Sequence, residues 1–172
     1  ELGAKDVYEL NKLGEIQQWC YDNGRSFWEY VEKCEGKEIW DYLDMVWQTM
    51  KQAIKNGLDH EGVLPGPLNL PRKAATYYTK AKGYRASLQS RGLVYSYALA
   101  VSEENASGGT IVTAPTCGAC GVLPAVLYHM HTSHDMSEQR ILRALATAGL
   151  VGNVVKQNAS ISGADVGCQG EV

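Results

Sequence analysis

The sequence contains 172 residues, of which 45% are hydrophobic and 20% are charged, and its formal net charge is −3. This length suffices for one domain with a hydrophobic core, and the composition excludes an intrinsically disordered chain. The balanced charge argues against nucleic-acid binding. No apolar run approaches the roughly 18 residues of a membrane span, which argues against membrane binding. Without a signal segment we expect a cytoplasmic protein.

The first 60 residues contain all four tryptophans and predict a helical packing segment without visible chemistry. Apolar residues recur at spacings of three and four in two runs, over about 7–21 and 39–54. Gly24 is expected to end the first helix, Ser26 to cap the next turn, and Gly57 to end the later helix.

Residues 61–172 form the motif-bearing segment, which begins with an extended connector over 61–71. Three of the five prolines lie in this connector, so it cannot be the interior of a helix. Its apolar side chains are typical of a functional loop rather than of a linker.

Further helices are predicted over about 93–105, 123–131 and 137–155, with a short extended piece at 110–113. There is no internal repeat and no convincing set of strands. The predicted fold class is therefore mainly α, with glycine-rich loops between the helices. The first and last residues do not resemble natural termini, so we expect residues 1–172 to be part of one all-α domain of a longer polypeptide, truncated at the C-terminal end.

The five cysteines divide by their surroundings. Cys20 and Cys34 lie in predicted helices and are expected to be small core residues. Cys117, Cys120 and Cys168 lie in glycine-rich turns, where a flexible backbone lets thiolates converge on a metal. A disulfide framework is not expected in a chain of this size without a signal segment.

The C-x-x-C pair formed by Cys117 and Cys120 permits three interpretations: a redox pair, half of a zinc site, or iron–sulfur cluster ligands. A redox pair needs an α/β context, and zinc needs further paired ligands. His129, His131 and His134 do not provide them, and we expect these histidines to be surface or core residues. Three loop thiols without a fourth suggest a cluster with one open iron.

Four motifs then occur in order, at residues 61–68, 97–106, 112–121 and 158–172 (EGVLPGPL, YALAVSEENA, VTAPTCGACG and NASISGADVGCQGEV). From about residue 60 to the end, this series closely resembles the catalytic alpha region of the iron–sulfur-dependent bacterial L-serine dehydratases. Four long motifs in a fixed order are far more specific than a single C-x-x-C pair.

The resemblance implies an L-serine ammonia-lyase that converts L-serine to pyruvate and ammonia with a [4Fe-4S] cluster and no pyridoxal phosphate. Two of the family's three cluster cysteines match Cys120 and Cys168, and the third would fall just beyond Val172. Cys117 stands where many relatives have Asn and is expected to line the cluster pocket. The resemblance also implies a serine dehydratase beta domain or subunit as partner, a possible homodimer, and an inactive isolated fragment.

Elimination of water from serine requires an activated hydroxyl and removal of the α-proton. An open iron can bind the hydroxyl as a Lewis acid. Polar loop residues beside the two cysteines are suited to binding the substrate carboxylate and ammonium: Thr113, Thr116, Asn158, Ser160 and Ser162.

The sequence assigns no general base, and His60 is the one histidine near a family motif. Glu103, Glu104 and Asp165 are candidates for the substrate ammonium, although a solvated helix end explains the two glutamates equally well. Lys156 invites a Schiff-base interpretation, but no glycine-rich phosphate site follows a strand here, so we reject it.

Two alternative functions remain open. One is a non-catalytic helical module that binds zinc through Cys117, Cys120 and Cys168. The other is a sister lyase that acts on L-cysteine, although the motifs match the serine enzymes almost letter for letter.

Overall fold

The computed structural model describes residues 7–113 and 116–158, and within these ranges it contains helices and no strand. The mainly α prediction is thereby confirmed. None of the described helices combines the length and the apolar character needed to cross a bilayer. The helices are α1 (Leu13–Asn23), α2 (Phe27–Glu35), α3 (Ile39–Asp59), α4 (Ala74–Lys82), α5 (Ala86–Ala106), α6 (Val122–Ser133) and α7 (Glu138–Asn158).

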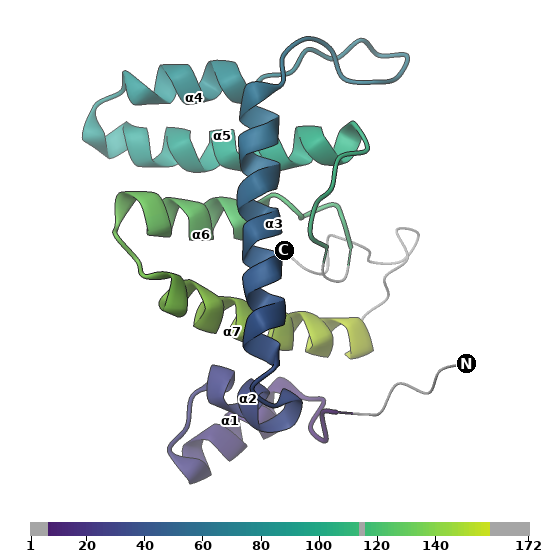
Figure 1. Cartoon of the computed structure of the whole chain (residues 1–172), viewed down its shortest axis with the longest axis vertical. Helices are drawn as coiled ribbons and strands as arrows, with labels where there is room; N and C mark the ends of the chain where they lie inside the picture. The colour runs from purple at the N-terminus through teal and green to yellow at the C-terminus, as the bar shows by residue number, and fades with distance from the viewer. Residues whose placement is uncertain (1–6, 114–115, 159–172) are drawn as a thin grey trace.

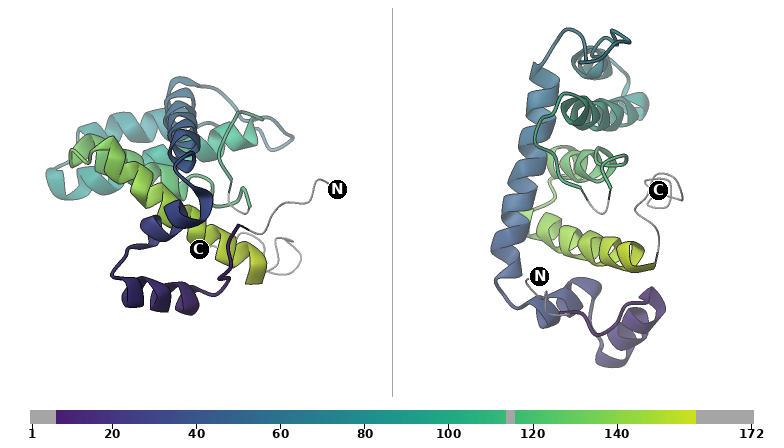
Figure 2. Two further views of the ribbon diagram at one scale, coloured as in Figure 1. Left: turned by 60° about the horizontal axis from the view of Figure 1, so that its bottom comes forward. Right: turned by 90° about the vertical axis from the view of Figure 1, so that its right-hand side faces the viewer.

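The long helix α3 organises the molecule. Helices α4, α5, α6 and α7 form a stack that crosses α3 on one side, and α1 and α2 lie at the end of the stack next to α7 (Figures 1 and 2). Successive helices in the stack run in alternating directions, so the loops between them gather at its two edges. This arrangement decides which loops can share a site.

The predicted cap at Ser26 is confirmed. The Ser26 backbone N–H donates to Glu29 Oε2 at 2.8 Å, so α2 begins with a capping box. This hydrogen bond, and then the one from Arg25, lower the pKa of the Glu29 carboxyl. Helix α1 ends at Gly24, whose φ of 59° is left-handed, and it begins at Leu13 rather than near residue 7.

Two clusters of buried residues hold the helices together. The first joins α1, α2, α3, α6 and α7 around the fully buried Trp47, and Cys20 and Cys34 pack against it as expected. The second joins α3, α5 and the beginning of α6. Its members are Ala53, Ile54, Tyr97, Val101, Cys120 and Ala125.

The prediction that Gly57 ends a helix is wrong, because α3 continues to Asp59. A Cβ atom at Gly57 would lie 2.2 Å from the carbonyl oxygen of Ala100 in α5. Gly121 meets α5 in the same way, because a Cβ atom there would lie 2.4 Å from the Ala98 carbonyl oxygen. These glycines therefore mark places where two backbones touch.

Helix α4 was not predicted, because its sequence lacks an apolar stripe and a local cap. Its first turn is capped instead by a residue of α5. The Glu103 Oε1 atom accepts hydrogen bonds from the backbone N–H groups of Lys73 at 2.6 Å and Ala74 at 3.2 Å. A carboxylate at a helix N-terminus also interacts favourably with the helix dipole.

The Gly57 contact leads to a test of stability. We expect Gly57→Ala to lower the free energy of unfolding by about 1–3 kcal/mol, because the added methyl group has only rigid backbone to displace. Gly149→Ala is the matched control: it lies within α7 with nothing within 4 Å of the new Cβ, and should raise stability by about 0.5–1 kcal/mol. Urea unfolding measures both, and equal effects would contradict the close approach.

Candidate functional site

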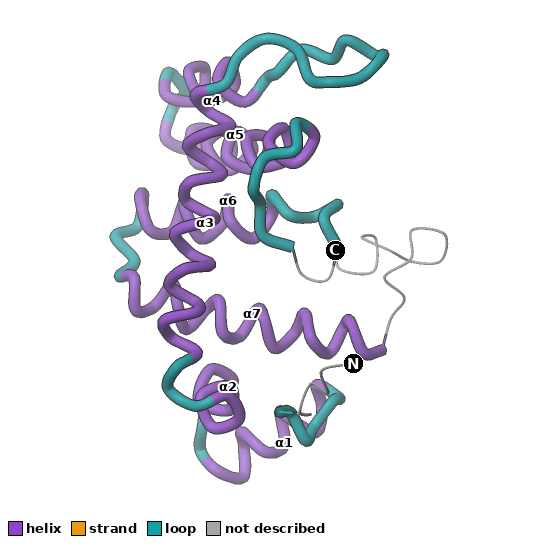
Figure 3. Tube along the Cα trace, turned by 45° about the vertical axis from the view of Figure 1, so that its right-hand side comes forward, coloured by secondary structure: helices purple, strands orange, loops and turns teal. Residues whose placement is uncertain are grey.

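The described parts of the sequence motifs lie at one edge of the helix stack. The 60–73 connector, the end of α5, the 107–113 and 116–121 segments and the end of α7 all lie at the right-hand edge in Figure 1, and the view in Figure 3 agrees. Segments far apart in the sequence are therefore available to one site.

Three predicted site residues line the same pocket at this edge. Thr113, Thr116 and Cys120 contribute to a cavity of about 350 Å³ beside the beginning of α6. Its other walls are mostly apolar and include Met50 of α3. A small cavity with apolar walls and a few converging polar groups is typical of a site for a small ligand. The remaining lining residues are Val112, Ala119, Val122, Leu123, Pro124 and Val126.

The hydroxyl of Thr116 is the most informative polar group in this pocket. Its Oγ1 atom is buried and has no hydrogen-bond partner among the described residues. A buried hydroxyl that makes no hydrogen bond costs roughly 1–3 kcal/mol. Such a group at a pocket wall is suited to a ligand that supplies the missing partner.

The two cysteines of the C-x-x-C pair differ in their surroundings. Cys117 is exposed, whereas Cys120 is 7% exposed and belongs to the second cluster of buried residues. Burial, and then the proximity of Cys117, raise the pKa of the Cys120 thiol. A raised pKa favours the protonated thiol. A bound metal cation would instead favour the thiolate, which is the form that metals bind.

The Cys120 thiol, together with the Thr116 hydroxyl that has no partner among the described residues, fits one side of a metal-containing group. Among the described residues, no group of three His, Cys, Asp or Glu side chains forms a complete metal site. Predicted residues Ser160, Ser162, Asp165 and Cys168 lie outside the described part of the chain.

Asn158 is the last residue of α7 and not part of a loop. Its side-chain amide donates hydrogen bonds to the backbone carbonyls of Val154 at 2.8 Å and Asn11 at 3.0 Å. The amide therefore ties the end of α7 to the segment before α1. Lys156, two residues earlier, is exposed.

A second polar cluster lies at the same edge, around the Glu104 carboxylate. Glu104 is 4% exposed, and its Oε1 atom lies 2.7 Å from Nδ1 of His60 and 3.5 Å from Nη1 of Arg72. Arg72 also donates through Nη2 to the Ser107 hydroxyl, which donates to the Glu103 carbonyl at 2.8 Å. The sequence indicates His60 and Glu104 as candidates, but no motif in it marks Arg72 or this pairing.

The neighbouring Glu103 has a structural part, because its Oε1 atom caps α4. Its Oε2 atom is buried without a partner in the described ranges. The candidate role of Glu103 in binding an ammonium group remains a prediction.

His60 differs from His129 because only one of its ring nitrogens makes a hydrogen bond among the described residues. With its proton on Nδ1, the imidazole donates to Glu104 and leaves the Nε2 lone pair open, and the side chain is 56% exposed. By contrast, both ring nitrogens of His129 are engaged, with Ser90 at 2.7 Å and Ser133 at 3.2 Å. His131 lies against Trp47, in agreement with the expected structural role.

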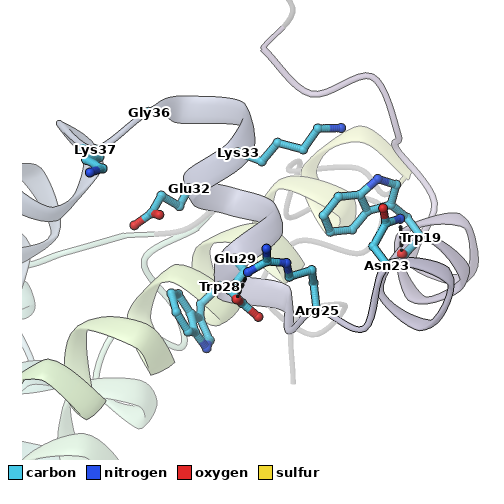
Figure 4. A pocket seen from close by; sticks show the side chains of 9 residues that line it. All are labelled: Trp19, Asn23, Arg25, Trp28, Glu29, Glu32, Lys33, Gly36 and Lys37. Carbon is cyan, nitrogen blue, oxygen red and sulfur yellow. Dashed lines mark hydrogen bonds and ion pairs between the residues drawn. The ribbon is translucent and has the colours of Figure 1, made fainter.

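A larger cavity of about 560 Å³ lies between α1 and α2, away from this edge (Figure 4). Several of its charged groups already have partners: Arg25 pairs with Glu29 at 2.7 Å, and Lys33 lies over the Trp19 ring. It contains none of the predicted site residues. We therefore place the candidate site at the smaller pocket, whose chemistry is better defined.

The Glu104 cluster makes a prediction about stability. We expect Glu104→Gln to lower the free energy of unfolding by about 3 kcal/mol, because it leaves the Arg72 guanidinium, only 9% exposed, without its counter-charge. Glu138→Gln, which breaks an exposed pair with Lys51, should cost less than about 1 kcal/mol. Chemical denaturation compares the two, and a similar loss from both would refute the proposed role of Glu104.

His129 makes a prediction about pH. Burial, and then His134, lower the pKa of His129 below its ordinary 6.5, so the unfolded chain binds the proton more readily. The contribution of His129 to stability is therefore present above about pH 6.5, and it is lost as the pH falls below 6.5. We expect His129→Gln to show a smaller loss of stability than the parent protein between about pH 7.5 and about pH 5.5. Thermal unfolding across this range measures the difference, and parallel curves would contradict the prediction.

Comparison with known proteins agrees with the motif pattern. The model of the family described as serine dehydratase alpha chain matches residues 6–172. The L-serine dehydratase of Haemophilus influenzae is 44% identical over 176 residues, which cover 96% of this chain and 38% of that protein. L-serine dehydratase 1 of Escherichia coli is 43% identical with the same coverage, and the L-serine dehydratase of Streptomyces coelicolor is 46% identical over 138 residues. The chain thus spans about 38% of the length of the first two relatives.

Proposed function

This chain belongs to the serine dehydratase alpha chain family, and from that premise we propose that it forms part of an L-serine ammonia-lyase. The proposed reaction is the elimination of water from L-serine, which gives pyruvate and ammonia. The observation that best supports it is the convergence of Thr113, Thr116 and Cys120 on one pocket. These three residues come from a single family motif.

The proposed cofactor is a [4Fe-4S] cluster, without pyridoxal phosphate. Cys120 would hold it together with Cys168 and a third cysteine beyond Val172. The cluster would supply Lewis-acid chemistry to the hydroxyl group of the substrate. The position of Cys120 at a pocket wall supports this assignment, and the exposed Cys117 is not proposed as a ligand.

The chain's own residues would bind and orient the substrate. The buried Thr116 hydroxyl can donate a hydrogen bond to the substrate carboxylate, and Thr113 lies on the same pocket. The apolar walls would limit water around the reacting carbon. Asn158, Ser160 and Ser162 remain predicted contributors.

His60 is the proposed proton acceptor from this chain. Its Nδ1–Glu104 contact fixes the ring so that Nε2 can take a proton, which is how a carboxylate orients a general base. The His60 side chain is 56% exposed, so Nε2 is open to a substrate.

The rest of the enzyme is proposed to come from a serine dehydratase beta domain or subunit. The chain spans 38% of the length of its relatives, so much of each relative lies outside the matched region. We therefore expect the isolated chain to be inactive. A homodimer and a cytoplasmic location are further predictions.

The experiment compares cysteine variants in the complete enzyme after anaerobic reconstitution with iron and sulfide. We expect Cys120→Ala to lose both the cluster absorbance near about 400 nm and pyruvate release from L-serine, because a thiolate ligand is missing. Cys117→Ala, three residues away, should retain both. His60→Gln should retain the absorbance but lower the rate of pyruvate release by about 10²-fold or more.

Other outcomes identify the alternatives. Stoichiometric zinc without sulfide would favour a zinc-binding module. Faster turnover of L-cysteine than of L-serine would favour the sister lyase. A requirement for pyridoxal phosphate, or an unchanged cluster in Cys120→Ala, would overturn the proposed assignment.

A further inference from the structure

The connector between α3 and α4 is an ordered loop that projects from the stack (Figure 3). Its two arms run antiparallel, with Val63 opposite Pro71. The Leu64 N–H donates to the Leu70 carbonyl at 2.8 Å, and the Arg72 N–H donates to the Gly62 carbonyl at 2.9 Å. We call residues 62–71 the projecting loop.

Both ends of the projecting loop are fixed at one carboxylate oxygen. His60, just before the loop, and Arg72, just after it, both contact Oε1 of Glu104. The next residue, Lys73, donates its backbone N–H to Glu103. A loop held at both ends loses little conformational freedom when a partner binds, which favours association.

The surface of the projecting loop is apolar. Leu68 is 76% exposed, Val63 55% and Leu70 51%, and no charged residue occurs between Gly62 and Pro71. Burying such a leucine against a partner favours association, because it removes apolar surface from water. A rigid apolar projection of this kind marks a contact surface.

We propose that the projecting loop is the surface on which the beta domain or subunit of the same enzyme docks. This inference rests on the proposed function, and it adds the place of contact. We infer the beta part as the occupant from the length of the relatives. They are more than twice as long as their match to this chain, and the family is that of an alpha chain.

The chemistry of the loop indicates the kind of contact. Pro65, Pro67 and Pro71 lack backbone N–H groups, so addition of a strand to the loop is disfavoured. The lack of charge makes an apolar face on the partner the matching surface. The loop lies at the same edge of the stack as the 107–113 and 116–121 segments, which carry pocket residues, so a partner docked here would lie along the edge that holds the candidate site.

Photo-crosslinking in the intact enzyme tests this docking surface. A photoreactive phenylalanine analogue replaces Leu68 in one variant and Leu88 in another, and the crosslinked peptides are identified by mass spectrometry. Leu88 is the matched control, since it is 55% exposed near the beginning of α5, at the far edge of the stack. We expect crosslinks to the beta part from position 68 and none from position 88.

A second measurement uses serine substitutions at exposed positions, which should leave the fold intact. We expect Leu68→Ser with Leu70→Ser to weaken association with the beta part by about 10-fold or more, and Leu88→Ser to leave it unchanged. If the beta part is fused, the loss appears as faster proteolysis between the two parts.

Crosslinks from position 68 only to a second alpha chain, or only within the same alpha chain, would overturn the proposal, as would no crosslink at all. Formation of the crosslink does not require catalytic activity on L-serine. An active, cluster-containing enzyme without the crosslink would disprove the docking surface alone, and a crosslinked enzyme inactive on L-serine would disprove the proposed function alone.

Discussion

The edge of the stack depends on the interactions of the Glu104 carboxylate. A buried charge is costly unless hydrogen-bonded or paired, and Glu104 contacts both His60 and Arg72. These two residues are the ends of the connector that leaves α3 and enters α4. The adjacent Glu103 caps the first turn of α4, so two consecutive residues of α5 hold the connector where it leaves α3 and where it enters α4.

Contacts between backbones position the other half of the edge. Gly57 and Gly121 lack the side chains that would separate α3 and α6 from α5. Gly121 directly follows Cys120, so the close approach to α5 also places the Cys120 thiol among buried residues. The pocket near Thr116 therefore depends on how closely three helices pack, and a single methyl group at these glycines would disturb it.

In the function proposed for this chain, the Glu104 cluster and the backbone contacts at Gly57 and Gly121 have complementary roles. The packed helices present Cys120 and Thr116 as one wall of a site, whereas the Glu104 cluster orients His60 and supports the projecting loop. In the same proposal, the apolar projecting loop is the surface that contacts the beta part. The chain's 38% share of its relatives' length agrees with such a partner.

Local signals in the sequence were enough to determine the mainly α fold, the Ser26 cap, the non-helical connector and the structural place of Cys20 and Cys34. Each rests on residues within one or two helical turns, where periodicity, capping and proline geometry act. Only the tertiary structure decided that Gly57 is a contact rather than a stop, that α4 is a helix, and that Glu104 pairs with residues 32 and 44 positions away. Pairings over such distances depend on how the helices stack, and no pattern within a single segment records them.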